Sequence, residues 1–337
     1  MNKVEKVLVW LVVLLLVVNS ASIGLSVWSL VKPVEKEETS APVLVVATTV
    51  PVPEQEGTYY FLAANNSSPF YVPGVKGLTD AGKAVGMKTE FVGPMEASTT
   101  EQMKTFEELI ASPNTKGIFW YAMDFNVGQP LVEAAQAKGI PVVIGGGDSP
   151  FKTRNAFVGY DNTVLGTQAA LWADKLIGCK GTIGTVAING VNLDARTQAF
   201  NNYFKTNCPE VKIIPRATHD GSAANEAATL EAYLVANPDL TLLWWADGDA
   251  SNIVQVWKDK QTAGSKVLLL ATDMPPVTLQ AVKDGVFIGS VGQDTYTESY
   301  TAVIMLDLLN KGLRVPDTLF LSAILVDKSN VDLYLGK

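Results

Sequence analysis

The sequence has little of the side-chain chemistry on which metal centres and common catalytic sites depend. It contains two cysteines and one histidine in 337 residues. These three side chains cannot supply a closed four-ligand zinc site of the cysteine/histidine kind, and they exclude any catalytic scheme that needs two histidines. A lone histidine, His219, is more typical of a structural or ligand-contact residue than of a catalyst. We therefore predict no metal site, no cofactor and no catalytic residue.

Basic residues are also scarce. The chain has 26 lysines and arginines against 34 aspartates and glutamates, for a formal net charge of −8. This balance argues against general nucleic-acid binding, which needs a basic surface to neutralise phosphates. The hydrophobic fraction of 47% excludes global disorder. The length of 337 residues suggests two domains of ordinary size.

Several nucleotide and nucleophile motifs are missing. There is no G-x-x-x-x-G-K-[ST] loop, no G-x-G-x-x-G at a strand-to-helix turn, and no G-x-S-x-G. The segment GGGDS at 145–149 could cradle a phosphate with its N–H groups, but nothing else supports that interpretation. Asp247-Gly-Asp249 could serve acid/base chemistry or a calcium loop, yet without a full ligand set a loop role is favoured for Asp249.

Residues 1–31 do not resemble part of the folded domain. Lys3 and Lys6 precede a continuously apolar run at 7–18, and no charge occurs over 7–31. Residues 1–22 fit a secretory signal peptide, whereas 7–31 is long enough for an uncleaved membrane anchor, which we favour. In either case the basic start predicts that the remainder lies outside the cytoplasmic membrane. Residues 32–57, rich in proline and glutamate, predict an extended tether.

From residue 58 onward, short apolar runs alternate with helical patterns. Most runs are continuous, which is typical of strands buried on both faces, and strand–helix alternation predicts a parallel α/β sheet. Eleven strands are too many for one standard doubly wound sheet, so we expect two lobes, with a (β/α)₈ barrel as the alternative. The predicted strands are 59–64, 88–93, 116–122, 140–146, 156–160, 182–188, 212–217, 240–246, 266–272, 286–292 and 319–326.

Carboxylates and amides follow nearly every predicted strand. In open parallel sheets, ligands bind at the carboxyl ends of the strands. Polar residues of this kind suit a polyol, because each can bind adjacent hydroxyl groups, and a sugar ring packs flat on an aromatic side chain. The alternative is that these strand-end carboxylates and amides are ordinary loop residues and helix N-caps. We assign two of them, Asp161 and Asn162, to a crossover between lobes and not to the ligand site. The neighbouring aromatics are Phe70, Tyr71, Trp120, Tyr121, Trp244, Trp245 and Tyr296.

Five segments together resemble the type I periplasmic sugar-binding proteins, the solute receptors of ABC importers of the ribose/galactose/xylose kind. They are NNSSPFY, VGYDN (158–162), NLDAR (192–196), ATDMPPVTLQAVKDG and GQDTYTESY. The resemblance covers 59 to about 335. It implies two similar Rossmann-like lobes, 59–160 plus 294–323 and 161–293 plus 324–337, which are joined by three crossover hinge segments and close around the ligand.

The resemblance also implies the ligand contacts. The family's contact positions fall on Ser68, Phe70, Tyr71, Asp124, Asp148, Arg196, His219, Asp247, Asp273 and Gln293. Three departures are notable: the fourth-strand arginine is replaced by GGGDS, the eighth-strand amide by Asp247, and a ring-stacking aromatic by His219. The expected site is therefore more acidic than in pentose and hexose binders. This leaves room for an amino sugar, a polyol, a furanose signal or another cationic ligand.

The resemblance implies an extracytoplasmic, membrane-tethered receptor that binds a small sugar-like ligand and delivers it to an ABC permease, not an enzyme. Two alternatives remain: a ligand-sensing partner of a membrane sensor, and an exported sugar enzyme with a carboxylate pair. Related repressors begin with a DNA-binding module, but here an apolar span stands in its place.

The two cysteines are predicted to lie close together. Cys179 precedes strand 182–188, and Cys208 follows a helix at about 193–206. The strand advances by roughly 23 Å and the helix returns by roughly 21 Å, so both cysteines lie at the ligand-distal end of the second lobe. An exported chain can oxidise them. We predict a disulfide, with two free buried thiols as the alternative.

Overall fold

The computed structural model describes residues 55–147, 150–151, 153–248 and 250–335. The predicted leader at 1–31 and nearly all of the tether lie outside these residues. Within the described part of the chain, no helix is both long and apolar enough to cross a membrane.

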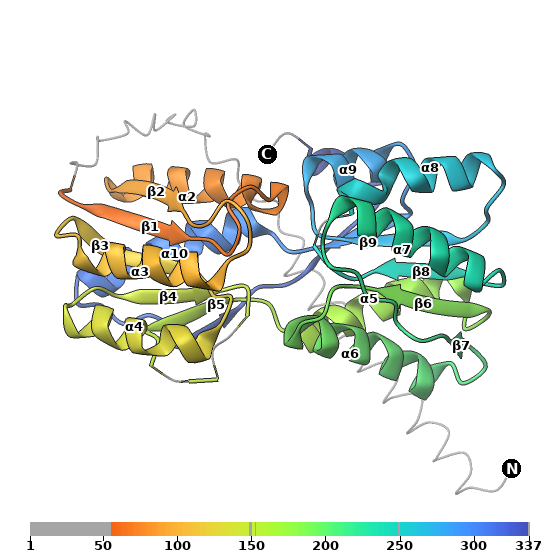
Figure 1. Ribbon diagram of the computed structural model, residues 1–337, viewed down its shortest axis with the longest axis horizontal. Coiled ribbons are helices and arrows are strands. Elements are labelled where there is room, and N and C mark those ends of the chain that lie inside the picture. The colour runs from red at the N-terminus through yellow and green to blue at the C-terminus, as the bar shows by residue number, and fades with distance from the viewer. Residues whose placement is uncertain (1–54, 148–149, 152, 249, 336–337) are drawn as a thin grey trace, which may run out of the picture. The chain divides into compact units, whose positions relative to one another are not determined.

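Strands and helices alternate along the chain, as the sequence pattern predicts (Figure 1). The elements are β1 (Thr58–Leu62), η1 (Pro69–Tyr71), α2 (Val72–Val85), β2 (Lys88–Val92), α3 (Thr99–Ala111), β3 (Thr115–Tyr121), α4 (Phe125–Ala137), β4 (Val142–Gly145), β5 (Ala156–Gly159), α5 (Asn162–Ile177), β6 (Thr182–Val186), α6 (Val191–Asn207), β7 (Lys212–Ile213), α7 (Ala223–Ala236), β8 (Leu242–Trp245), η2 (Ser251–Ile253), α8 (Val254–Thr262), β9 (Leu268–Thr272), α9 (Pro276–Lys283), β10 (Gly289–Gly292), α10 (Thr295–Asn310), β11 (Thr318–Phe320), β12 (Ile324–Val326) and η3 (Val331–Leu333).

The strands form two six-stranded sheets, in the orders β11-β5-β4-β3-β1-β2 and β12-β10-β9-β8-β6-β7. All neighbours in the first sheet are parallel, and only β12 runs antiparallel in the second. We call each sheet with the helices packed on it the first lobe and the second lobe. The two-lobe α/β fold is confirmed, and the single barrel is excluded.

Both faces of each sheet are buried, which explains the continuous apolar runs. Along β3, Ile118 and Trp120 enter one core of the first lobe, whereas Phe119 and Tyr121 enter the other. Alternation of side chains along a strand makes this division unavoidable. Because helices cover both faces, the inner strands are apolar at most positions, and the two-residue period that marks a half-exposed strand is lost.

The chain passes between the sheets three times. It crosses after β5, after β10 and between β11 and β12. The second crossing places α10, drawn in blue, against β3, β4 and β5 of the first lobe (Figure 1). This helix brings Glu298 beneath the first sheet, far from its sequence neighbours in the second lobe.

Two predicted strands differ from the observed elements. The run at 319–326 is not one strand, because the chain leaves the first sheet after Phe320 and joins the second at Ile324. The run at 212–217 forms a strand only over Lys212–Ile213, with one isolated bridge from Ala217 to Val186. Pro215 lies between these pairings and lacks the N–H that a continuous ladder needs.

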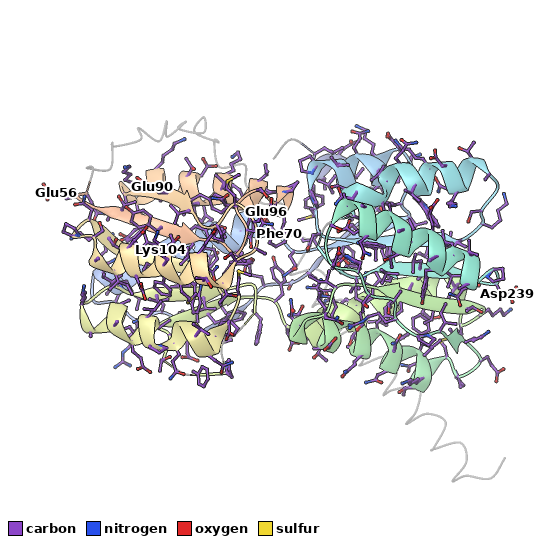
Figure 2. The ribbon with its side chains drawn as sticks, in the orientation of Figure 1. Glu56, Phe70, Glu90, Glu96, Lys104 and Asp239 are labelled. Carbon is purple, nitrogen blue, oxygen red and sulfur yellow. A yellow bond between two sulfur atoms is a disulfide. The ribbon has the colours of Figure 1, made fainter. Side chains whose placement is uncertain are left out.

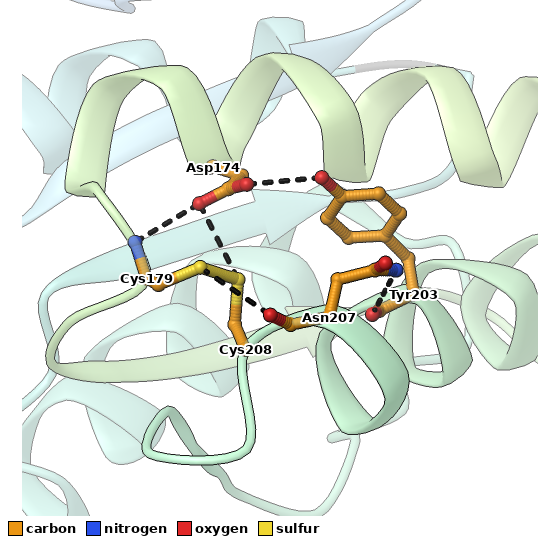
Figure 3. The surroundings of a disulfide bond; sticks show 5 residues. All are labelled: Asp174, Cys179, Tyr203, Asn207 and Cys208. Atoms are coloured by element: carbon orange, nitrogen blue, oxygen red, sulfur yellow. Dashed lines mark hydrogen bonds between the residues drawn. A yellow bond between two sulfur atoms is a disulfide. The ribbon is translucent and has the colours of Figure 1, made fainter.

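Cys179 and Cys208 are joined by a disulfide (Figure 3). The carboxylate of Asp174, on α5, accepts a hydrogen bond from Cys179 N at 2.9 Å and another from the Tyr203 hydroxyl at 2.9 Å. The bridge links the end of α5 to the end of α6, immediately before β6 and β7 begin. It therefore lies at the amino ends of the strands of the second lobe.

Candidate functional site

A cavity of about 680 Å³ is lined by loops that follow the carboxyl ends of the strands in both lobes. In Figure 2, Phe70 and Glu96 lie at this end of the first lobe, whereas Glu56 lies at the opposite end. The structure brings these predicted contact residues to the cavity: Ser68, Phe70, Tyr71, Arg196, His219, Asp247, Asp273 and Gln293.

Arg196 is held in place by uncharged oxygens of the second lobe. Its Nε and Nη2 donate to Asn162 Oδ1 at 3.1 and 2.8 Å, and Nη2 also donates to Gln293 Oε1 at 3.1 Å. Nη1 donates to the carbonyl of Ala246 at 2.9 Å. Burial lowers the pKa of Arg196, although the charges of Asp273 and Asp247 oppose this effect. Asn162 thus belongs to the support of the site as well as to a crossover.

Asp247 and His219 form a buried carboxylate–imidazole pair. His219 Nε2 lies 2.7 Å from Asp247 Oδ2, which also accepts a hydrogen bond from Ile188 N at 3.0 Å. His219 Nδ1 accepts a hydrogen bond from Gly221 N at 3.1 Å, and its ring stacks on Trp245 with centroids 5.0 Å apart. The backbone therefore fixes Nδ1 by a hydrogen bond while Nε2 faces the carboxylate, so His219 positions Asp247.

Glu226, from the first turn of α7, is the third charged member of this group. It is 4% exposed, and its Oε1 lies 3.8 Å from His219 Nδ1. Burial alone would lower the pKa of His219, but the hydrogen bond to Asp247 and the charges of Asp247, Glu226 and Asp220 outweigh burial and raise it. Glu226 also lines the cavity. Glu226 was not predicted from the sequence, because acidic residues are common in the first turn of any helix, whichever way the side chain points.

Asp273 follows β9 in a conformation that side chains rarely adopt. Its φ is +60°, in the left-handed region, and it is 1% exposed. Its Oδ1 accepts a hydrogen bond from Gln293 N at 3.1 Å, and its carbonyl accepts one from Ser290 Oγ at 2.6 Å. A Cβ on Gly248 would lie 2.5 Å from Asp273 Oδ2, so glycine is required there for the carboxylate to fit. Backbone strain of this kind is typical of functional sites.

The first lobe contributes aromatic rings and a glycine-rich loop. The rings of Phe70 and Tyr71 meet edge to face with centroids 5.0 Å apart, and Tyr71 and Tyr121 are 5.5 Å apart. Gly145, Gly146 and Gly147 also line the cavity. A Cβ on Gly146, whose φ is +76°, would lie 2.7 Å from the Tyr121 ring, so the loop passes directly over that ring. This wall offers flat apolar surface and main-chain groups.

Behind this wall lies Glu298, which is fully buried. Its carboxylate accepts hydrogen bonds from the Tyr121 hydroxyl and from Gly146 N, the latter at 2.9 Å. Burial raises the pKa of Glu298 to about 7, against the lowering effect of these two hydrogen bonds. One side chain of α10 thus fixes both the ring and the loop. The spacing along α10 was a sequence signal for the burial of Glu298. Glu298 precedes Ala302 by four residues and Leu306 by eight, so all three lie on the same, buried face of the helix.

A second buried side chain joins the strand ends of the first lobe. Gln102, on α3, is fully buried. Its Nε2 donates to the carbonyls of Ala63 and Tyr121, both at 2.8 Å, and its Oε1 accepts from Met123 N at 3.1 Å. The ends of β1 and β3 are therefore tied together where the cavity begins.

One predicted contact, Asp124, is not among the cavity residues that the structure describes. The Asp124 carboxylate accepts hydrogen bonds from Asn126 N and Val127 N and so caps α4; it does not line the cavity. Asp148 lies outside the described residues. Asp161 and Asp294 cap α5 and α10 in the same way. The strand-end carboxylates therefore divide into helix caps and cavity residues.

The predicted aromatic set divides as well. Trp120 and Trp244 are core residues, and Trp245 is covered by His219. Tyr296 lies on the first lobe, where its hydroxyl is 3.2 Å from Asp80. Only Phe70, Tyr71 and Tyr121 of this set line the cavity. Alternation along β3 and β8 decides this outcome, since neighbouring residues face opposite sides of the sheet.

The arrangement supports binding of a hydroxylated ligand. Carboxylate oxygens accept hydrogen bonds from hydroxyl groups, guanidinium and amide N–H groups donate to them, and aromatic rings pack on the apolar face of a sugar. Within the described residues, the single cluster with metal-ligand spacing is Asp174, Cys179 and Cys208. Its cysteines form the disulfide, and it lies outside the cavity.

Comparison with known proteins agrees with the fold. Residues 59–313 match the model of a family described as "Periplasmic binding protein domain". The chain is 26% identical over 268 residues to the D-allose-binding periplasmic protein of Escherichia coli, covering 74% of this chain and 84% of that protein.

Two solved structures share the fold. A sugar-binding protein of a sugar ABC transporter from Bacillus halodurans superposes with a TM-score of 0.76 at 21% identity, covering 82% of this chain and 99% of that one. A solute-binding protein from Burkholderia graminis, in complex with D-arabinose, superposes with a TM-score of 0.75 at 23% identity, covering 84% and 98%.

Proposed function

Because the chain belongs to the periplasmic binding protein family, we propose that it is an extracytoplasmic solute-binding protein of an ABC importer. It holds a small carbohydrate or polyol in the cavity and delivers it, unchanged, to a membrane permease. The basic start and apolar span of the leader support an extracytoplasmic location, with residues 7–31 as the membrane tether.

One observation carries this proposal: polar groups from one lobe face aromatic groups from the other across the same cavity. Asp247, Asp273 and Arg196 come from the second lobe, whereas Phe70 and Tyr121 come from the first. A sugar has hydroxyl groups at its edges and C–H groups on its faces, so it needs both kinds of surface. Three crossovers between the lobes form hinges about which the walls can close on the ligand.

Isothermal titration calorimetry of the full-length chain with pentoses, hexoses, amino sugars and polyols tests the binding step. We expect saturable binding of at least one hydroxylated ligand, which mass spectrometry then recovers unchanged. Chemical conversion of the bound sugar would instead establish the enzyme alternative. A panel without any binding ligand would contradict the proposed function.

The delivery step needs a separate test. We expect deletion of the gene to abolish uptake of the radiolabelled ligand into cells. Normal uptake, combined with loss of a transcriptional response to the same ligand, would contradict transport and support the alternative of a sensor partner.

A further inference from the structure

We propose, resting on the function above, that the sugar-like ligand carries a cationic amine and that Asp247 binds its ammonium group. Three carboxylates lie in the buried part of the second-lobe wall. Glu226, Asp247 and Asp273 are 4%, 6% and 1% exposed, respectively. Among the described residues that line the cavity, the basic groups facing them are the guanidinium of Arg196 and the imidazole of His219.

The guanidinium does not form hydrogen bonds to these carboxylates in the structure. Its four hydrogen bonds go to the uncharged oxygens of Asn162, Ala246 and Gln293. Arg196 therefore supplies one positive charge to the region and uses most of its N–H groups within the protein. Among the residues of this wall that the structure describes, three carboxylates therefore meet a single permanent positive charge.

Neighbouring carboxylates raise the pKa of His219, but the hydrogen bond that Nδ1 accepts leaves the ring with one proton in this geometry. His219 Nδ1 accepts the N–H of Gly221 at 3.1 Å, so it carries no proton of its own, and Nε2 faces Asp247 at 2.7 Å. A second proton on the ring would have to displace the Gly221 N–H. The ring positions Asp247 Oδ2 and leaves the negative charge of the pair in place.

Asp247 Oδ1 is the atom that points to a ligand. It is buried and has no hydrogen-bond partner among the residues that the structure describes, and Asp247 lines the cavity. A buried carboxylate oxygen without a donor is costly, and the cost rises when a ligand expels water from the cavity. A hydroxyl supplies a donor alone, whereas an ammonium supplies donors and the missing charge.

Matched pairs of ligands test this assignment in the full-length chain. D-Glucosamine, D-galactosamine and D-mannosamine are compared by calorimetry at pH 7 with their parent hexoses and with their N-acetyl derivatives, in which the nitrogen is uncharged. For at least one sugar, we expect the amine to bind with a dissociation constant at least about tenfold lower than both partners.

Asp247→Asn removes the charge and keeps the shape of the side chain. We expect it to weaken binding of the amine by about thirtyfold or more, and to change binding of the parent hexose far less, so that the preference disappears. The matched control is Asp239→Asn, which makes the same charge change in the second lobe but away from the cavity, as Figure 2 shows. It should leave the preference intact, and thermal unfolding reports whether each variant folds.

The outcomes separate the two proposals. A neutral sugar that binds as tightly as its amine, or an amine preference that survives in Asp247→Asn, overturns the inference and leaves the proposed function standing. Absence of binding in all three series overturns the inference, and the proposed function is overturned only if the pentoses and polyols of the wider panel also fail to bind.

Discussion

The two walls of the cavity differ in where they keep their carboxylates. In the second lobe, Asp247, Asp273 and Glu226 line the cavity directly. In the first lobe, the exposed Glu96 lines the cavity, but the buried carboxylate, Glu298, lies behind the wall and holds Tyr121 and the glycine-rich loop by hydrogen bonds. Both walls follow the carboxyl ends of parallel strands, so the fold alone does not cause the difference.

The difference separates two tasks. A wall lined by buried carboxylates can select a ligand by its charge, whereas a wall made mainly of rings and main-chain groups selects a ligand by its shape. A carboxylate behind a wall acts on the ligand only by fixing the groups in front of it. We therefore expect changes in the second-lobe wall to alter affinity, and changes behind the first-lobe wall to alter mainly stability.

The largest expected effect is a loss of stability on removal of the disulfide, which belongs to neither wall. The disulfide closes a loop with a sequence separation of 29 at the amino ends of the second-lobe strands. Replacing both cysteines by serine should lower the free energy of unfolding by about 3 to 4 kcal/mol, measured by urea denaturation. Ligand affinity should stay constant, because the bridge lies at the end opposite the cavity. A large fall in affinity would show that the two ends are coupled.

Glu298 should give the first lobe a pH-dependent stability. Its pKa is about 7 in the folded chain and 4.5 as the ordinary value. Below pH 4.5 the Glu298 carboxyl is protonated in both the folded and the unfolded chain, and its contribution to the free energy of unfolding is complete. As the pH rises to about 7 the unfolded chain releases this proton first, so stability falls by about 3 kcal/mol.

Glu298→Gln stays uncharged and should remove this part of the pH dependence. The measurement is the difference in free energy of unfolding between wild type and variant from pH 4 to pH 8, which cancels the opposite slopes of other carboxylates. A difference that does not change with pH would contradict the assignment.

Asp273→Asn tests the second-lobe wall. Asparagine tolerates the left-handed conformation, so the backbone should persist while the charge is lost. We expect ligand affinity to fall by roughly thirtyfold, about 2 kcal/mol, as for a central buried contact. Calorimetry measures it, with Asp239→Asn as the control. An affinity within a factor of three of wild type would show that Asp273 supports the loop but does not bind ligand.

Tyr121→Phe has the smallest expected effect and sharpens the contrast. It removes the donor to Glu298 while keeping the ring at the cavity. The free energy of unfolding should fall by about 1 to 2 kcal/mol. The Tyr121 hydrogen bond lowers the pKa of Glu298, so its loss should raise that pKa and move the Glu298 transition to higher pH. Tyr60→Phe, a half-buried tyrosine of β1, is the control. A loss of affinity larger than the loss of stability would place the hydroxyl in the ligand site.

Sequence patterns identified most of the fold and part of the candidate site. Continuous apolar runs predicted parallel strands, and the rule for strand ends placed Asp247, Asp273 and Gln293 near the cavity. The same rule gave Asp124 equal weight, although Asp124 caps a helix. Capping and ligand binding use the same residue types at the same positions, so spacing could not separate them.

The residues that sequence analysis missed lie on helices. Glu226 and Glu298 come from the first turns of α7 and α10. Glu298 reaches the first lobe only because the chain crosses over after β10, and a contact made by a crossover joins residues without any local sequence relation. Gln102 needs no crossover between lobes, but it is also hidden, because the carbonyls that it binds, on Ala63 and Tyr121, are 39 and 19 residues away in the sequence.

The sequence by itself determined the class of fold, because burial on both faces of a strand leaves a local pattern that any window of the chain reveals. It also determined the acidic chemistry available at the strand ends. Only the tertiary structure decided which carboxylates line the cavity, which cap helices and which lie behind a wall. Those roles depend on the direction of each side chain across the crossovers, and direction is set by packing between segments that are distant in the sequence.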